Sequence, residues 1–121
     1  MPRHIEINFN RLRAGLLLNS HFYSHNFVTV TDPKCQCGAR FQSTEHFLIN
    51  CPLLLMEREV LLAGLSDLNC LHDFETYTTH RKADFLLNGD ENLSIETNEN
   101  LIEISAHFIT QAIQILGQGI F

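Results

Sequence analysis

The feature that most constrains this chain is a cluster of three cysteines and one histidine within residues 35–52, a segment we call the knuckle. Its sequence is CQCGARFQSTEHFLINCP, with a glycine after the second cysteine and a proline after the third. Thiolate sulfur and imidazole nitrogen are the usual ligands of Zn²⁺ in tetrahedral structural sites. The pattern therefore predicts a zinc site whose ligands are Cys35, Cys37, His46 and Cys51.

Residues between the ligands favour convergence on one ion. Gly38 can adopt a positive φ, which lets the chain turn directly after Cys37. Ser43 or Thr44 is expected to cap a short helix that presents His46 from its first turn. Four protein ligands leave no open position for water, so a catalytic zinc is not expected.

The step from His46 to Cys51 is the less obvious part of the pattern. Five residues turn about 140° around an α-helix, so the two side chains would face different directions if the helix simply continued. Pro52 is expected to end the helix, because the residue before a proline is pushed towards extended backbone. Cys51 can then turn back to the metal.

Two other interpretations of these residues stay open. The cysteines could be ordinary buried thiols with His46 as a capping residue, or two of them could form a disulfide. Lone structural cysteines seldom gather beside a histidine and a glycine, and a Cys-x-Cys bridge is strained. The Cys-x-Cys pair is tighter than the spacing of most zinc knuckles, and eight residues separate Cys37 from His46, so the pattern is not a standard one.

Length and composition fit one domain over residues 1–121, with the metal supplementing a modest core. Hydrophobic residues make up 45% and charged residues 18%, the balance of a globular chain. No apolar run is long enough to span a bilayer, and the first residues lack the apolar core of a signal peptide. We expect an intracellular protein of the nucleus or cytoplasm, without membrane contact, whose thiols stay reduced. Cys70 is expected to be a buried apolar residue rather than a fifth ligand.

Charge is unevenly distributed along a chain whose net charge is −6. Residues 1–58 contain six basic and four acidic residues, whereas the remainder contains two basic and ten acidic ones. Contact with RNA or DNA phosphates is therefore expected only in the first half. The candidate phosphate contacts are Arg11, Arg13, Lys34 and Arg40, with bases stacking on His21, Phe22, Tyr23 or Phe41. The alternative is that the arginines form a solvated face and the aromatic residues belong to the core.

The fold class predicted is mainly α, a small helical domain with at most a minor extended arm. Residues 1–34 form an N-terminal helical segment and arm, and residues 53–121 form a helical tail after the knuckle. Apolar and polar residues alternate from Ile5 to Phe9, which is typical of a short strand, and a helical turn or two follows from Asn10. A second short helix is expected over residues 21–24, and the arm over residues 28–31.

The tail is expected to begin with a helix over residues 53–65 that ends at Gly64, with Glu57, Arg58 and Glu59 pointing outward. Its predicted apolar stripe is Leu53, Met56, Val60 and Leu61. A short helix starting at Ser66 or Asp67 follows.

Two further helices complete the predicted tail. Thr79 caps one that ends at Gly89, with apolar contacts from Ala83, Phe85, Leu86 and Leu87. Ser94 caps the last one, roughly residues 96–116, whose apolar face either packs in the core or meets a partner. The central stripe of that last helix is Leu101, Ser105, Phe108, Ala112 and Leu116.

Several segments together resemble the zinc-binding C-terminal region of reverse transcriptases encoded by non-LTR (LINE-like) retrotransposons. They are FNRLRAG, LLNSHFYSHNF, the Cys-x-Cys-Gly pair and EHFLINCPLL, and the similarity extends more weakly to DFLLNGDENLS. The resemblance implies a parent polypeptide that is an RNA-directed DNA polymerase, with this piece after the polymerase domain. It also implies the other reverse transcriptase domains as partners, and a terminal fragment or truncated copy of an element.

This chain is not expected to be an enzyme by itself. It has no Tyr-x-Asp-Asp polymerase motif and no carboxylate cluster of the kind a two-metal nuclease needs. The function predicted is a zinc-binding structural accessory module of a reverse transcriptase that assists RNA or DNA binding. The alternative is a purely structural or protein-interaction domain that docks, or associates with a second copy, through its C-terminal helix.

Overall fold

The computed structural model describes residues 3–13, 34–40 and 42–116. This part of the chain contains helices and turns without a β-strand, which confirms the mainly α prediction. The short helix expected at residues 21–24 and the arm at residues 28–31 lie outside the described residues. None of the described helices is both long and apolar enough to cross a bilayer. The elements are α1 (Arg3–Arg13), η1 (His46–Asn50), η2 (Pro52–Leu54), α3 (Leu55–Asp67), α4 (Leu71–Thr76), α5 (Thr79–Asn88) and α6 (Ile95–Leu116).

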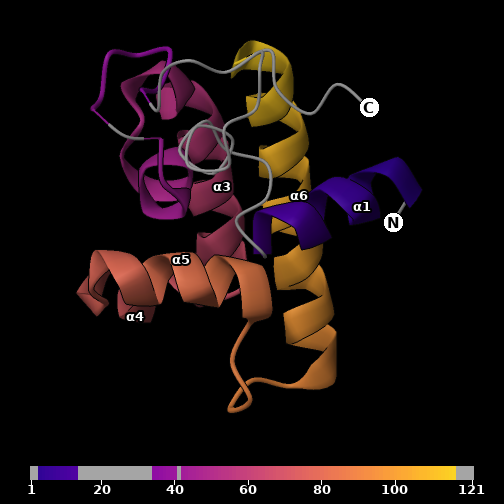
Figure 1. Cartoon of the computed structure of the whole chain (residues 1–121). Helices are drawn as coiled ribbons and strands as arrows, with labels where there is room; N and C mark the ends of the chain where they lie inside the picture. The colour runs from indigo at the N-terminus through magenta and orange to yellow at the C-terminus, as the bar shows by residue number, and fades with distance from the viewer. Residues whose placement is uncertain (1–2, 14–33, 41, 117–121) are drawn as a thin grey trace.

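The long helix α6 is the centre of the arrangement. In Figure 1, α3 runs beside it, α1 crosses it, and α5 reaches its N-terminal half with one end. All three pack against it. The hydroxyl of Ser94 caps α6 as predicted, since it accepts the backbone N–H of Thr97 at 3.1 Å. The apolar face of α6 packs in the core, because its buried residues include the whole predicted stripe of Leu101, Ser105, Phe108, Ala112 and Leu116.

The strand expected between Ile5 and Phe9 is wrong, because these residues lie within α1. Phe9 and Leu12 are buried and Ile5 is partly buried against the core, whereas Ile7 is exposed. Positions 5, 9 and 12 share one face of a helix, so packing this face against α6 buries three apolar side chains at once. A strand of this length would have had no neighbouring strand to pair with among the described residues.

Helix α3 buries a different face from the predicted one. Leu54, just before the helix, is buried together with Leu61 and Leu65. Leu61 belongs to both the predicted stripe and the buried face, whereas Met56 and Val60 lie on a face of the helix roughly 140° away. Both faces are apolar. Periodicity alone could not decide which of them packs on α6. Three members of the predicted stripe, which we call the outer stripe, are instead exposed: Leu53 at 46%, Met56 at 78% and Val60 at 63%.

Gly64 lies inside α3 rather than at its end. The helix continues to Asp67, and Gly64 faces α6. A Cβ atom at Gly64 would lie 3.0 Å from Cδ1 of Ile104, which is closer than ordinary van der Waals contact. The missing side chain therefore lets the two helices approach each other closely.

The turns between the shorter helices differ from the prediction by a few residues. The helix expected to start at residue 66 or 67 begins only after Asn69, where a φ of 59° interrupts the helical backbone. Thr78 rather than Thr79 caps α5, because its hydroxyl accepts a backbone N–H of the first turn at 3.2 Å. Gly89 ends α5 as predicted, with a φ of 73°. The four apolar residues predicted for α5 are buried, namely Ala83, Phe85, Leu86 and Leu87.

Candidate metal centre

The four predicted ligands lie together in the knuckle. The donor atoms of Cys35, Cys37, His46 and Cys51 are all within 4.8 Å of one another. The Sγ atoms of Cys35 and Cys51 are 3.7 Å apart, and Sγ of Cys37 is 3.2 Å from Nε2 of His46. None of the four cysteines in the chain forms a disulfide, and Cys70 is buried by itself, away from this group, as predicted.

The spacing of the donor atoms fits a metal ion. Two sulfur atoms bound to one tetrahedral Zn²⁺ at about 2.3 Å lie about 3.8 Å apart. The separation of 3.7 Å between Cys35 and Cys51 agrees with that value, and it is far too long for a disulfide bond, whose length is about 2.0 Å. Three sulfurs and one imidazole nitrogen are also the donor set that soft or borderline metals prefer. The residues therefore fit a bound metal ion.

A tight turn brings the first two cysteines together. The backbone N–H of Gly38 donates to the carbonyl of Cys35 at 2.9 Å, and the N–H of Cys35 donates to the carbonyl of Ala39 at 3.1 Å. The φ of Gly38 is 95°, a value that residues with a Cβ rarely adopt. The predicted role of this glycine in the turn is confirmed.

A turn of π-helix solves the spacing between His46 and Cys51. The hydroxyl of Ser43 accepts the backbone N–H of His46 at 3.2 Å, which confirms the predicted cap. The N–H of Cys51 then donates to the carbonyl of His46 at 2.7 Å, an i to i+5 bond. This wide turn brings residues five apart back to the same side. Before Pro52 the backbone of Cys51 is extended, with φ −65° and ψ 118°, as predicted.

The thiols differ in how readily they lose a proton. Burial raises the pKa of Cys51 to about 12, and the adjacent thiol of Cys35 adds to the rise. Burial also acts to raise the pKa of Cys37, but hydrogen bonds from the backbone of Ala39 and from the two other thiols outweigh it and lower that pKa. Of these two thiols, Cys37 therefore loses its proton more readily than Cys51. A bound cation favours the thiolate form of Cys51, which burial otherwise opposes.

The surroundings of His46 favour the neutral form of its imidazole ring. Burial lowers its pKa, and the positive charge of Arg58 lowers it further. A metal binds the neutral imidazole and competes with the proton for the same nitrogen. Disfavouring the protonated ring therefore favours coordination.

Arg58 supports the site from α3, although it was expected to point outward. Its guanidinium is partly buried and donates to the carbonyl of Leu48 from Nε at 3.1 Å and to that of Cys51 from Nη1 at 3.0 Å. A longer bond of 3.5 Å runs from Nη2 to the carbonyl of Phe47. Sequence reasoning missed this role. The signal was the spacing, because position 58 lies seven residues, or about two helical turns, after Cys51.

Two glutamines, which sequence reasoning also missed, connect the knuckle to α6. The fully buried amide of Gln42 lies 3.6 Å from Sγ of Cys35 and donates to Oε1 of Gln36 at 2.9 Å. Gln36 in turn donates to the carbonyl of Leu116, in the last turn of α6, at 2.6 Å. Amide donors to a ligand sulfur stabilise its thiolate form and fix its position. The chain of contacts ties the site to the end of the central helix.

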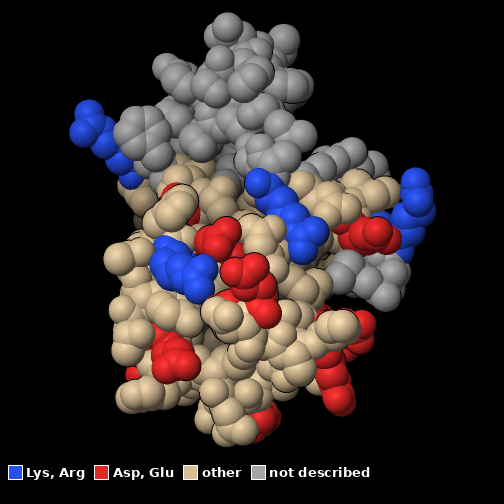
Figure 2. Space-filling view, turned by 90° about the horizontal axis from the view of Figure 1, so that it is seen from below, with Lys and Arg blue, Asp and Glu red and all other residues tan. Residues whose placement is uncertain are grey.

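The predicted phosphate contacts do not form one group with the metal ligands. Arg13, in α1, donates to the carbonyl of Leu87 at 2.7 Å and lies over the ring of Phe9 at 4.4 Å, so its guanidinium takes part in packing. Lys34 and Arg40 are exposed at the two ends of the first turn of the knuckle. On the face shown in Figure 2, basic side chains are interspersed with acidic ones rather than gathered into a patch. The remaining predicted contact residues have side chains outside the described part of the structure; they are Arg11, His21, Phe22, Tyr23 and Phe41.

Comparison with known proteins gives this chain no relative. No protein-family model, no curated protein and no solved structure matches it.

Proposed function

We propose that Cys35, Cys37, His46 and Cys51 bind one structural Zn²⁺ that fixes the knuckle to the helical body. The observation that carries the proposal is the convergence of three thiols and one imidazole within 4.8 Å, without a disulfide. Zn²⁺ is the metal that most often takes this donor set in a closed, four-ligand site. Such a site leaves no coordination position for a substrate, so the role of the metal is to stabilise the fold.

The knuckle packs against the helical core. Phe47 and Leu48 are buried, and the ring of Phe47 packs edge-on against Phe108 of α6 with centroids 6.4 Å apart. Structural zinc contributes about 10 to 16 kcal/mol in small finger peptides, comparable to the net stability of a whole domain. Binding of the metal should therefore determine whether residues 35–52 are folded.

The larger role that we propose rests on the resemblance to the C-terminal region of non-LTR reverse transcriptases. In this role the chain is an accessory module of a longer polypeptide, and its zinc site preserves a surface that other domains or a nucleic acid contact. The acidic charge of residues 59–121 restricts phosphate binding to residues 1–58, which hold the knuckle, α1 and Lys34.

The test of the metal site is to purify the full chain and measure its metal content by mass spectrometry. One Zn²⁺ per chain is expected, and Co²⁺ in its place should give the visible absorption of a tetrahedral thiolate site. Cys51→Ser should lose the metal, together with the structure of residues 35–52. Cys70→Ala is the matched control, because it also removes a buried thiol but leaves the four ligands in place, so it should keep one metal per chain.

A metal-free purified protein that keeps its full helicity would contradict this function. So would a Cys51→Ser variant that binds as much metal as Cys70→Ala. A site that takes another metal in preference to zinc would keep the proposed structural role but change the identity of the ion.

Contact with RNA or DNA is the second proposed activity, favoured by the exposure of Lys34 and Arg40 at either end of the turn that contains Cys37. Because so few basic side chains are available, binding to RNA or DNA should be weak and salt-sensitive. A labelled single strand should bind at low salt, and Lys34→Ala with Arg40→Ala should weaken this binding. Arg11→Ala with Arg13→Ala tests the predicted contacts in α1. Undetectable binding at low salt, or binding that neither pair of substitutions changes, would leave the protein-interaction role as the remaining function.

A further inference from the structure

Helix α3 has a second apolar face that nothing in the described structure covers. Its inner face, which includes Leu61 and Leu65, is buried in the core. Of the outer stripe, Met56 and Val60 are exposed along the other face, and Leu53 is exposed in η2 just before the helix. Met56 and Val60 are four residues apart in α3, so their side chains lie on the same side of the helix. Such an exposed group differs from the scattered single apolar residues that are normal on protein surfaces.

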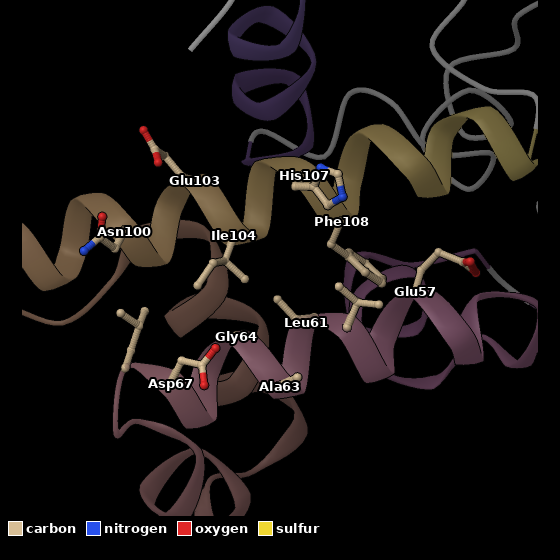
Figure 3. A pocket seen from close by; sticks show the side chains of 12 residues that line it. Glu57, Leu61, Ala63, Gly64, Asp67, Asn100, Glu103, Ile104, His107 and Phe108 are labelled. Atoms are coloured by element: carbon tan, nitrogen blue, oxygen red, sulfur yellow. The ribbon is translucent and has the colours of Figure 1, made fainter.

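The outer stripe leads into a groove between α3 and α6. The groove has a volume of about 590 Å³, and Val60, Leu61, Gly64 and Ile104 are among the residues that line it. Figure 3 shows Leu61 and Ile104 pointing into the space between the two helices, with Phe108 at one end. Because Gly64 has no side chain, the end of the Ile104 side chain lies directly against the backbone of α3 at this point of the groove. The floor is therefore apolar and continuous with the outer stripe.

The edge of the groove is acidic. Glu57 and Asp67 from α3 and Glu103 from α6 line it, and among its described lining residues there is no Lys or Arg. Figure 3 shows the side chain of Glu103 pointing away from the floor and that of Asp67 beside Gly64. Carboxylates around an apolar floor favour a ligand with an apolar centre and cationic flanks.

A second copy of the same surface is a poor occupant. Packing two of these grooves face to face would bring the carboxylates of one copy close to those of the other, which costs free energy. Association through α6, the surface suggested by its apolar sequence, is also disfavoured, because most apolar residues of that helix are already buried. The charge of the groove thus selects a different kind of partner.

We propose that the groove and the outer stripe form a docking site for an amphipathic helix of a partner protein, with Lys or Arg on both sides of the apolar stripe of that helix. In helix-in-groove recognition the bound helix places apolar anchors at i, i+3 or i+4, and i+7 against an apolar surface, which the floor of the groove and the exposed Met56 and Val60 provide. From Leu53 to Asp67 the surface is about 20 Å long, enough for about four helical turns of a partner. The proposal does not depend on which metal occupies the knuckle.

The test uses the full, metal-loaded chain and two labelled synthetic peptides of about 18 residues with the same leucine stripe. One carries lysines beside the stripe, and the other carries glutamates at the same positions. The lysine peptide should bind at least about tenfold more tightly in fluorescence anisotropy, and added salt should reduce the difference. Equal binding of the two peptides, or no binding of either, would overturn the proposal.

Variants locate the binding surface. Met56→Ser with Val60→Ser should weaken binding of the lysine peptide at least about tenfold without loss of helicity, because both side chains are exposed. Ile95→Ser is the matched control, since Ile95 is 80% exposed on α6 but does not line the groove. Asp67→Lys with Glu103→Lys should reverse the preference towards the glutamate peptide. If sedimentation instead finds a dimer that Val60→Ser dissociates, the occupant is a second copy and the proposal is wrong.

Discussion

Arg58 fixes the position of the last metal ligand. Its guanidinium donates to the carbonyls of Leu48 and Cys51, which lie where η1 ends. Carbonyls at the end of a helix have no partner within the helix, and leaving them unpaired away from water costs free energy. The guanidinium also lies 5.8 Å from the ring centre of Phe108, so it joins η1, α3 and α6. One side chain thereby holds the backbone from which Cys51 reaches the cluster.

We predict that Arg58→Met lowers the free energy of unfolding by about 2 to 3 kcal/mol, because a side chain of similar length no longer supplies the hydrogen bonds. The affinity for Zn²⁺ should fall about tenfold, since the backbone at Cys51 loses its support. Urea unfolding and competition with a chromophoric chelator measure the two effects. Arg3→Met, at an exposed position of α1, is the control and should change stability by less than about 0.5 kcal/mol. Equal results for the two variants would show that the contacts of Arg58 do not support the site.

At the scale of elements, the connection between α5 and α6 depends on Gly89. Its φ of 73° and ψ of −158° fall in a region of backbone conformation that is almost restricted to glycine. A Cβ atom there would lie 2.5 Å from Oδ1 of Asn98. The amide of Asn98 accepts the backbone N–H of Asp90 at 3.1 Å and donates to its carbonyl at 2.8 Å. The backbone after α5 is thus held directly against the first turns of α6.

Gly89→Ala and Gly38→Ala compare two glycines of positive φ, of which only Gly89 also has a steric conflict. Both residues have positive φ, but a Cβ at Gly38 would meet nothing within 4 Å. We expect Gly38→Ala to cost about 1 kcal/mol through strain alone, and Gly89→Ala to cost about 3 kcal/mol because Asn98 must also move. Thermal or urea unfolding measures both values. If the two substitutions cost the same, the contact with Asn98 adds nothing to stability.

At the scale of the whole molecule, the metal site and the α4–α5 pair are stabilised by largely different contacts, although η1 touches α5 and Nδ1 of His80 lies 3.1 Å from Oε1 of Glu45. The knuckle depends on its ligands, on Arg58 and on the link from Gln36 to the carbonyl of Leu116. The helices α4 and α5 are joined by a separate aromatic group in which ring centroids lie 5.7 to 6.4 Å apart. That group consists of Phe74, Tyr77 and Phe85.

Removal of the metal should therefore unfold the molecule unevenly. With a chelator, hydrogen exchange should accelerate in residues 35–52 and in the last turn of α6, because Gln36 no longer donates to the carbonyl of Leu116. Protection in α5 should fall much less. Hydrogen–deuterium exchange followed by mass spectrometry, with and without chelator, measures the difference between segments. Uniform loss of protection would mean that the metal supports the whole fold as one cooperative unit, and no change would mean that it supports none of it.

Local chemistry allowed much of this molecule to be predicted from its residues. The gathering of the four ligands followed from their residue types and spacing, the turn at Gly38 from the absence of a Cβ, and the extended backbone at Cys51 from Pro52. The buried stripe of α6 and the end of α5 followed from helical periodicity and a C-terminal glycine. Each of these features depends on neighbours close in the sequence.

The sequence by itself determined which residues can bind a metal and which segments form the later helices, because spacing and backbone preference act locally. Only the tertiary structure decided which of two apolar faces of α3 is buried, that Arg58 turns inward to Cys51, and that Gly64 serves close packing rather than a helix end. Each of these outcomes depends on where α6 lies. The apolar periodicity of one helix shows which of its side chains share a face, but not which face contacts a segment distant in the sequence. The exposed outer stripe is the direct consequence of that choice.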